Sequence, residues 1–259
     1  MVGSWYLSPE RHAVECLAFV TASCLVIRAI SPRLSTYPTQ HADKLVPPLL
    51  IKIATAFFYL CQLVYKSNGY GGKILFMAMP CNMLWSIWAL LCFGPLTLQT
   101  RHVMYQLIIP YTSLAIVAIA TPDVSDLKMW MEVPFFFLMH GALLAYPLYF
   151  LASGRISVLP FDGSVVSNFL MWWLLSCAYF ALFYFGVALP LSLVSGINLN
   201  YMLSPPPTPG NIISGPNFRL QSTLCCAVAF FLIQFLVTTF SVLKSAVNKN
   251  SCFSTKKCA

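Results

Sequence analysis

Residues 74–94 read ILFMAMPCNMLWSIWALLCFG, and this stretch decides how the chain is interpreted. It is uncharged and long enough to cross a bilayer as a helix, which needs about 20 apolar residues. Pro80 lies about two turns below its start, where a helical proline loses a backbone hydrogen bond and clashes with the carbonyl four residues back. We therefore predict a kink that leaves the Phe76 carbonyl as a free acceptor beside the Cys81 thiol and the Asn82 amide.

Composition places this stretch in a membrane protein. Of 259 residues, 59% are hydrophobic and 8% are charged, against about 25% charged in soluble domains. The mean hydropathy is +0.76. We predict an all-α fold, a polytopic helical bundle with about seven transmembrane helices in one domain, 1–259. The expected spans are 12–30, 46–65, 74–94, 103–120, 134–152, 168–196 and 222–243.

Lysine and arginine predict the orientation, because cytoplasmic loops are enriched in both. Lysine and arginine are more numerous on the side of the membrane that holds the basic tail, 244–259. We therefore expect a cytosolic carboxy terminus and a lumenal or outside amino terminus. The net charge of +8 then reflects topology and attraction to anionic headgroups. No basic run is interleaved with aromatics, so nucleic acid is not expected as a partner.

The ten cysteines give no sign of a metal site or a disulfide framework, because no two form a C-x-x-C pair. We expect most of them to be small packing residues and expect neither metal nor cofactor. Cys252 and Cys258 lie on the basic tail, where reversible palmitoylation is expected.

Ionisable groups at membrane depth are costly and indicate function by default. His140 is placed deep in the fifth span, about 9 Å below Pro134 at ~1.5 Å per residue. Cys81 lies about 10 Å below Ile74 by the same rise. The third and fifth spans run in the same direction, so the thiol and the imidazole are expected at one depth in one leaflet.

More polar groups gather on that side. The sixth span ends there in Asn198 and Asn200, and residues 121–133 form a loop on the same face. Their amides, with that of Asn82, are candidates for headgroup or oxyanion contacts. The alternative for Asn198 and Asn200 is that they are turn or cap residues that close the span.

The pair Cys81 and His140 suggests nucleophilic catalysis. A neutral imidazole can take the thiol proton and return it to a leaving group. The thiolate would attack a lipid ester and hold the acyl chain as a thioester. The alternative is a packing cysteine and a histidine bonded to a backbone carbonyl. Met77, Trp85 and Trp88 fit an apolar lining on the Cys81 face, and ordinary interhelical packing explains them equally well.

An ordered set of motifs resembles the transmembrane protein 164 family. It comprises Pro80-Cys81, Glu132 eight residues before His140, Pro147-Leu148-Tyr149, Asn198-Leu199-Asn200 with Met202-Leu203 and Pro205, and Gly215-Pro216. Two departures mark a divergent member. The family's Asn-Pro-Cys-His is Met79-Pro80-Cys81-Asn82 here, and its Met-Leu-Cys-Pro is Met202-Leu203-Ser204-Pro205.

The resemblance implies an endomembrane acyltransferase, in the endoplasmic reticulum or Golgi rather than the plasma membrane. Such enzymes are taken to move an acyl chain from phosphatidylcholine to a lyso ether phospholipid, and their fold resembles that of the androgen-induced-gene hydrolases. By position, Cys81 matches the family nucleophile and His140 the family histidine. The implied partners are phospholipid, lysophospholipid and the bilayer, and no oligomeric state is implied.

Two other functions stay open on sequence grounds. The first is a lipid ester hydrolase with the same pair, in which water accepts the acyl group. The second is a non-catalytic receptor, transporter or scaffold. A transporter of ions or polar solutes usually needs more intramembrane charge than one histidine.

Overall fold

The chain forms an all-helical bundle in the computed structural model, which describes residues 6–34, 46–68, 73–125, 127–153, 164–206 and 213–255. The first five α-helices are α1 (Pro9–Ile30), α2 (Leu49–Asn68), α3 (Pro80–Phe93), α4 (Leu98–Ile108) and α5 (Thr112–Ala120). They are followed by α6 (Glu132–Ala152), α7 (Val165–Phe183), α8 (Leu189–Ser195) and α9 (Phe218–Thr255). Short helical turns are η1 (Ser31–Arg33), η3 (Lys73–Ala78) and η5 (Leu199–Tyr201), with a π-helical turn η4 (Tyr184–Ala188).

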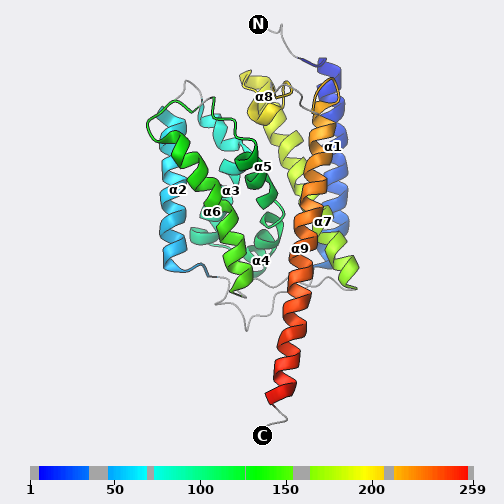
Figure 1. Ribbon diagram of the computed structural model, residues 1–259. Helices are drawn as coiled ribbons and strands as arrows, with labels where there is room; N and C mark the ends of the chain where they lie inside the picture. The colour runs from blue at the N-terminus through cyan, green and yellow to red at the C-terminus, as the bar shows by residue number, and fades with distance from the viewer. Residues whose placement is uncertain are drawn as a thin grey trace.

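The helices run up and down past one another (Figure 1), and α1 begins at the end of the bundle opposite to that where α9 finishes. Six segments of the described chain are long and apolar enough to cross a membrane, and α3 is a shorter apolar helix. In the third of these segments α4 and α5 are joined, and in the fifth α7 continues through η4 into α8. The prediction of an all-α membrane bundle with about seven membrane helices is confirmed.

The third predicted span is not one kinked helix, and this part of the prediction was wrong. Residues Lys73–Ala78 form a 3₁₀ turn, and Met79 is extended with φ −69° and ψ 145°. Because the residue before a proline is biased away from the helical region, the chain breaks at Met79. Pro80 then occupies the first turn of α3, where its missing N–H costs nothing.

Two other spans are interrupted for comparable reasons. In the fourth, turns at Pro110 and Tyr111 separate α4 from α5, as expected of a proline that removes a ladder bond. In the sixth, the π-helical turn η4 ends just before Pro190, so the span continues with a bulge. The bulge frees the carbonyl of Phe185, which accepts a hydrogen bond from the Cys16 thiol at 3.1 Å.

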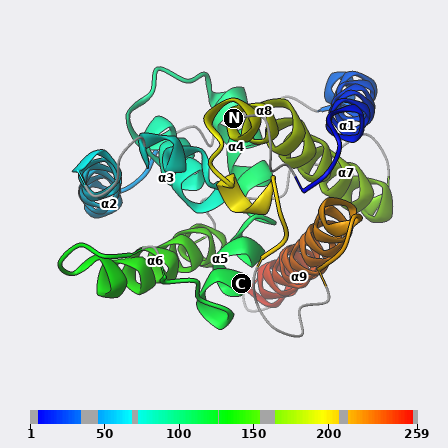
Figure 2. The same cartoon turned by 90° about the horizontal axis from the view of Figure 1, so that it is seen from above.

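Two groups of helices make up the bundle (Figure 2). Helices α2 to α6 form one, called the α2–α6 group here. Helices α1, α7, α8 and α9 form the other, called the α1–α9 group. Within each group the helices contact one another, and α5 with α9, α4 with α7 and η3 with η5 make contacts between the groups.

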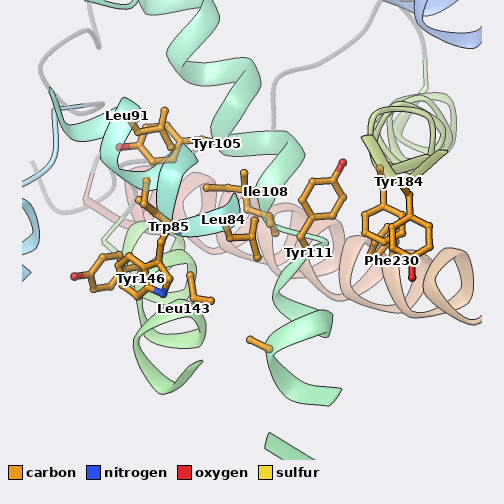
Figure 3. Packing of buried hydrophobic residues seen from close by; sticks show 14 of the residues in the cluster. Leu84, Trp85, Leu91, Tyr105, Ile108, Tyr111, Leu143, Tyr146, Tyr184 and Phe230 are labelled. Carbon is orange, nitrogen blue, oxygen red and sulfur yellow. The ribbon is translucent and has the colours of Figure 1, made fainter. Parts of the chain in front are cut away.

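Buried aromatic side chains fill the centre of the α2–α6 group. Trp85 and Trp88 of α3 are almost wholly buried and lie edge-on to Tyr146 of α6 at centroid distances of 5.5 and 5.2 Å. Figure 3 shows Tyr111 between this cluster and the rings of Tyr184 and Phe230 in the other group. The Tyr111 hydroxyl donates to the Ser176 carbonyl at 2.8 Å, so one side chain joins the two groups.

Candidate functional site

Cys81 lies in the first turn of α3, directly after Pro80. Its side chain is half-buried against the core and forms no disulfide. No side chain caps this end of the helix, and the first bond of the helical ladder runs from Met83 N–H to the Met79 carbonyl. The backbone amides of Cys81 and Asn82 precede that bond. They therefore lie at the positive end of the helix dipole, which stabilises negative charge near the thiol.

Asn82 is buried and holds the segment that leads into α3. Its Nδ2 donates to the Phe76 carbonyl at 2.7 Å, and Met79 N–H donates to the same oxygen at 2.9 Å. The sequence predicted a free acceptor at Phe76, and that prediction was wrong because these two donors satisfy it. The Asn82 side chain is thereby fixed next to Cys81 by its position in the turn.

His140 lies two turns into α6 and is 2% exposed. Its Nδ1 is 2.7 Å from the Phe136 carbonyl, four residues earlier. Because a carbonyl oxygen only accepts, Nδ1 must carry the hydrogen of this bond. A neutral ring then has its lone pair on Nε2, which is the form needed by a general base.

The structure places the two predicted catalytic residues on neighbouring helices, since α3 contacts α6. Within the described part of the chain, no hydrogen bond joins the Cys81 sulfur to either nitrogen of His140. Catalytic hydrogen bonds are often long in the absence of substrate and tighten in the complex. The pairing of Cys81 with His140 therefore stays a prediction.

Asn198 and Asn200 serve the turn that follows α8. Asn198 Nδ2 donates to the Ser204 carbonyl and hydroxyl at 3.1 and 2.8 Å, and its Oδ1 accepts from the amides of Leu203 and Ser204 at 2.7 and 3.2 Å. Asn200 Nδ2 donates to the Tyr184 hydroxyl at 2.7 Å. These hydrogen bonds support the alternative that the sequence left open, in which Asn198 and Asn200 are turn residues that close the span.

The predicted apolar lining of the Cys81 face, Met77, Trp85 and Trp88, is not observed as a lining. Trp85 and Trp88 are 0% and 1% exposed and pack against other aromatic rings of the α2–α6 group. Met77 belongs to η3 and not to α3, so it does not share a helical face with Cys81. Ordinary interhelical packing, the alternative that the sequence left open, therefore accounts for Trp85 and Trp88.

Sequence reasoning missed a buried ion pair close to the site. Lys66 Nζ of α2 lies 3.1 Å from Glu132 Oε1 at the start of α6, and the two side chains are 10% and 3% exposed. Lys66 Nζ also lies 5.9 Å above the ring of Phe76. Lys66 follows the predicted span 46–65 and Glu132 falls in the predicted loop 121–133, whereas both lie in helix ends that pack together.

A second missed cluster centres on Arg219 in the first turn of α9, which is 1% exposed. Its Nε lies 2.7 Å from Glu15 Oε2, and its Nη1 lies 2.7 Å from His12 Nδ1. Nη1 also donates to the Met202 carbonyl at 3.1 Å. The spacing of His12 and Glu15 is the signal that could have found it, because residues three apart share a helix face.

The described residues contain no group of three or more His, Cys, Asp or Glu side chains that could hold a metal ion. The two cysteines proposed for palmitoylation lie outside the part of the chain whose side chains are described.

Comparisons with known proteins identify the family of this chain. The TMEM164 family model matches residues 6–239. The chain is 30% identical over 244 residues to a protein named Transmembrane protein 164 homolog from Dictyostelium discoideum, which covers 88% of this chain and 81% of the relative. No solved structure matches.

Proposed function

Because the chain belongs to the TMEM164 family, we propose that it is a membrane-embedded phospholipid acyltransferase in which Cys81 is the nucleophile and His140 the general base. The acyl donor is a phospholipid such as phosphatidylcholine, and the acceptor is a lyso ether phospholipid. The proposal places the protein in endomembranes, where such lipids are remodelled. The bilayer itself would deliver both substrates.

In the first half-reaction, Nε2 of His140 takes the Cys81 proton and the thiolate attacks the ester carbonyl of the donor. The tetrahedral intermediate then expels the lysophospholipid alkoxide, which takes the proton from the imidazolium. The acyl chain remains on Cys81 as a thioester. The amides at the start of α3 are the available donors for the oxyanion, and backbone donors of this kind contribute about 3 kcal/mol each.

In the second half-reaction, the hydroxyl of the acceptor lysophospholipid attacks the thioester. Nε2 of His140 takes the hydroxyl proton, and the Cys81 thiolate leaves and is reprotonated. Water in place of the lipid hydroxyl would give a free fatty acid. Transfer and hydrolysis therefore share the chemistry of both residues and differ in the acceptor that reaches the thioester.

The observation that carries the proposal is the position of Cys81 in an uncapped first helical turn. A thiol there lies beside the backbone amides of the first helical turn and the positive end of the helix dipole, which stabilise the oxyanion of a tetrahedral intermediate. The bond from His140 Nδ1 to the Phe136 carbonyl supports the same chemistry, because it leaves Nε2 as the base.

The first test changes the nucleophile. Cys81→Ala is expected to lower acyl transfer at least ~100-fold in membranes supplied with phosphatidylcholine and a lyso ether phospholipid, since the covalent route is lost. Cys24→Ala, which removes an exposed cysteine from α1, is the control and should keep wild-type activity. Equal activity of Cys81→Ala and wild type, at equal expression, rejects the mechanism.

The base is tested in the same assay with His140→Asn. The asparagine Nδ2 can still donate to the Phe136 carbonyl, while the nitrogen that would act as base is gone. Both half-reactions should slow ~100-fold with the fold intact, within the usual range for general base catalysis. Product analysis with and without the lyso acceptor separates transfer from hydrolysis.

A further inference from the structure

Two consecutive residues in the turn after α8 have a backbone conformation that side chains disfavour. Asn200 has φ 47° and Tyr201 has φ 60°, in the left-handed region. Asparagine tolerates this region, whereas a bulky aromatic residue there is a true outlier. Such strain persists only where the surroundings impose it, and it concentrates at functional sites.

Hydrogen bonds from both sides of the turn impose the conformation. Asn198 closes residues 198–204 with its two donor and two acceptor bonds to Leu203 and Ser204. Tyr184 and Asn200 exchange two more bonds of 2.7 Å, because the tyrosine hydroxyl donates to the Asn200 carbonyl and accepts from its amide. We call residues 198–204 the strained turn.

Arg219 fixes the strained turn to the α1–α9 group. Its Nη1 donates to the Met202 carbonyl within the turn, while its Nε is 2.7 Å from the Glu15 carboxylate on α1. The guanidinium is 1% exposed, so these contacts exclude water. A buried ion pair is weak evidence for stability, because apolar residues of the same size often stabilise a fold as well. We therefore interpret Arg219 as a residue that positions the strained turn and not as one that mainly stabilises the fold.

The far side of the strained turn contacts the segments that precede the two helices of the proposed catalytic pair. Its η5 segment contacts η3, the segment that leads into α3 and Cys81 (the turn lies near the centre of Figure 2). The Tyr201 hydroxyl donates to Asp123, in the connection between α5 and α6, the helix of His140. The strained turn thus contacts both the segment that leads into α3 and the connection that leads into α6.

We infer that the strained turn, held by Arg219, positions the start of α3 against α6, so that Arg219 and Tyr201 are positioning residues for the acyl transfer. This inference rests on the proposed function. Neither residue would touch the reacting atoms. Their effect is to fix the distance between the Cys81 sulfur and His140, where a displacement of about 1 Å can cost ~100-fold in rate.

The test uses the full-length protein in membranes and compares Arg219→Lys with Arg11→Lys. Arg11 also pairs with Glu15, at 2.8 Å, but it is partly exposed and makes no contact with Met202 that the structure records. Lysine at 219 keeps the charge and loses the fork that spans Glu15 and the Met202 carbonyl. We expect kcat to fall ~10-fold with KM unchanged for Arg219→Lys, and both constants to stay within about twofold for Arg11→Lys.

Tyr201→Phe provides the second variant, because it keeps the ring and removes only the hydroxyl bond to Asp123. It should slow the labelling of Cys81 by a lipid-like electrophile ~3- to 10-fold, with the fold intact and only a small change in the unfolding temperature. If Arg219→Lys fails to fold, this variant decides. Unchanged kcat and labelling in folded Arg219→Lys, or in Tyr201→Phe, overturns the inference.

Failure of the inference and failure of the proposed function are distinguishable. An active Cys81→Ala rejects the function and the inference with it. An inactive Cys81→Ala together with normal positioning variants rejects only the inference. A fall in unfolding temperature with unchanged specific activity would show that Arg219 has a structural role alone, and this outcome also overturns it.

Discussion

The α2–α6 group and the α1–α9 group differ in where their buried charges lie. Trp85, Trp88 and Tyr146 in the α2–α6 group interlock as aromatic rings, and one ion pair lies at its edge. In the α1–α9 group, Glu15 and Arg219 form a polar cluster that joins α1, α9 and the strained turn. Aromatic rings also pack in this group, as in the stacked pair Phe19 and Phe185.

The comparison shows that two kinds of contact have different roles in a membrane bundle: apolar packing fills the space between helices, and polar contacts set the positions of helix ends. In lipid, helices gain little from the hydrophobic effect, so close packing and polar contacts hold them together. Aromatic rings fill the interhelical space in the body of the α2–α6 group. Hydrogen bonds and ion pairs have defined directions, and they place the helix ends at which the candidate site lies.

The largest effect should follow from breaking the ion pair of the α2–α6 group. Lys66→Met leaves the Glu132 carboxylate buried without its cation, and removing one member of a buried pair costs about 3–5 kcal/mol. Unfolding in detergent micelles measures the loss. The double variant with Glu132→Gln should recover part of it, and a Lys66→Met protein of wild-type stability would show that the pair is not needed.

A smaller effect should follow from weakening the aromatic packing. Trp88→Leu keeps an apolar side chain but opens a cavity beside Tyr105, Tyr146 and Phe150, at a cost of about 2 kcal/mol. Phe231→Leu on α9, at a residue that is 37% exposed, is the control at an exposed position of the other group and should cost less than 1 kcal/mol, as is usual for exposed sites. Equal losses in thermal unfolding would show that the burial of Trp88 does not set the cost.

The smallest effect concerns the contact between the groups at Asp123. Hydrogen bonds from Ser125 and Tyr201 hold the pKa of its carboxyl below the usual value. A carboxyl with a depressed folded pKa contributes stability above its unfolded pKa of about 3.9 and loses it as the pH falls through the folded pKa. Because the side chain is exposed, the contribution should stay below about 1 kcal/mol.

Asp123→Asn removes this titration, so its unfolding temperature should change less than that of wild type between pH 6 and pH 3. The measurement is a pair of pH series in the same micelles, with the difference between the two proteins reporting Asp123 alone. Parallel curves across the whole range would show that the hydrogen bonds from Ser125 and Tyr201 to Asp123 do not stabilise the fold.

Much of the fold follows from local sequence. Apolar runs about 20 residues long predict the membrane helices, and the structure has them with the expected alternation of direction. The exact ends did not follow, as at Pro80. A proline can kink a helix or begin one, and the choice depends on the preceding residues, which here form a 3₁₀ turn packed against α2.

The candidate site divides in the same way. The sequence identified Cys81, Asn82 and His140, and the structure adds the helical first turn of the thiol and the Phe136 carbonyl that orients the imidazole. The sequence could not reveal the partners of Arg219, because Glu15 lies more than two hundred residues away along the chain. Nothing local tells a loop arginine from one buried between two helices.

The sequence by itself determined that this protein is a helical membrane bundle. The reason is that an apolar run or a proline affects mainly the segment in which it lies, so each helix can be predicted separately. Only the tertiary structure decided which polar groups meet: Asn82 with the Phe76 carbonyl, Lys66 with Glu132, and Arg219 with Glu15 and the Met202 carbonyl. The reason is that an unpaired polar group in an apolar interior costs several kcal/mol and must find a partner, while the identity of that partner depends on how the helices pack.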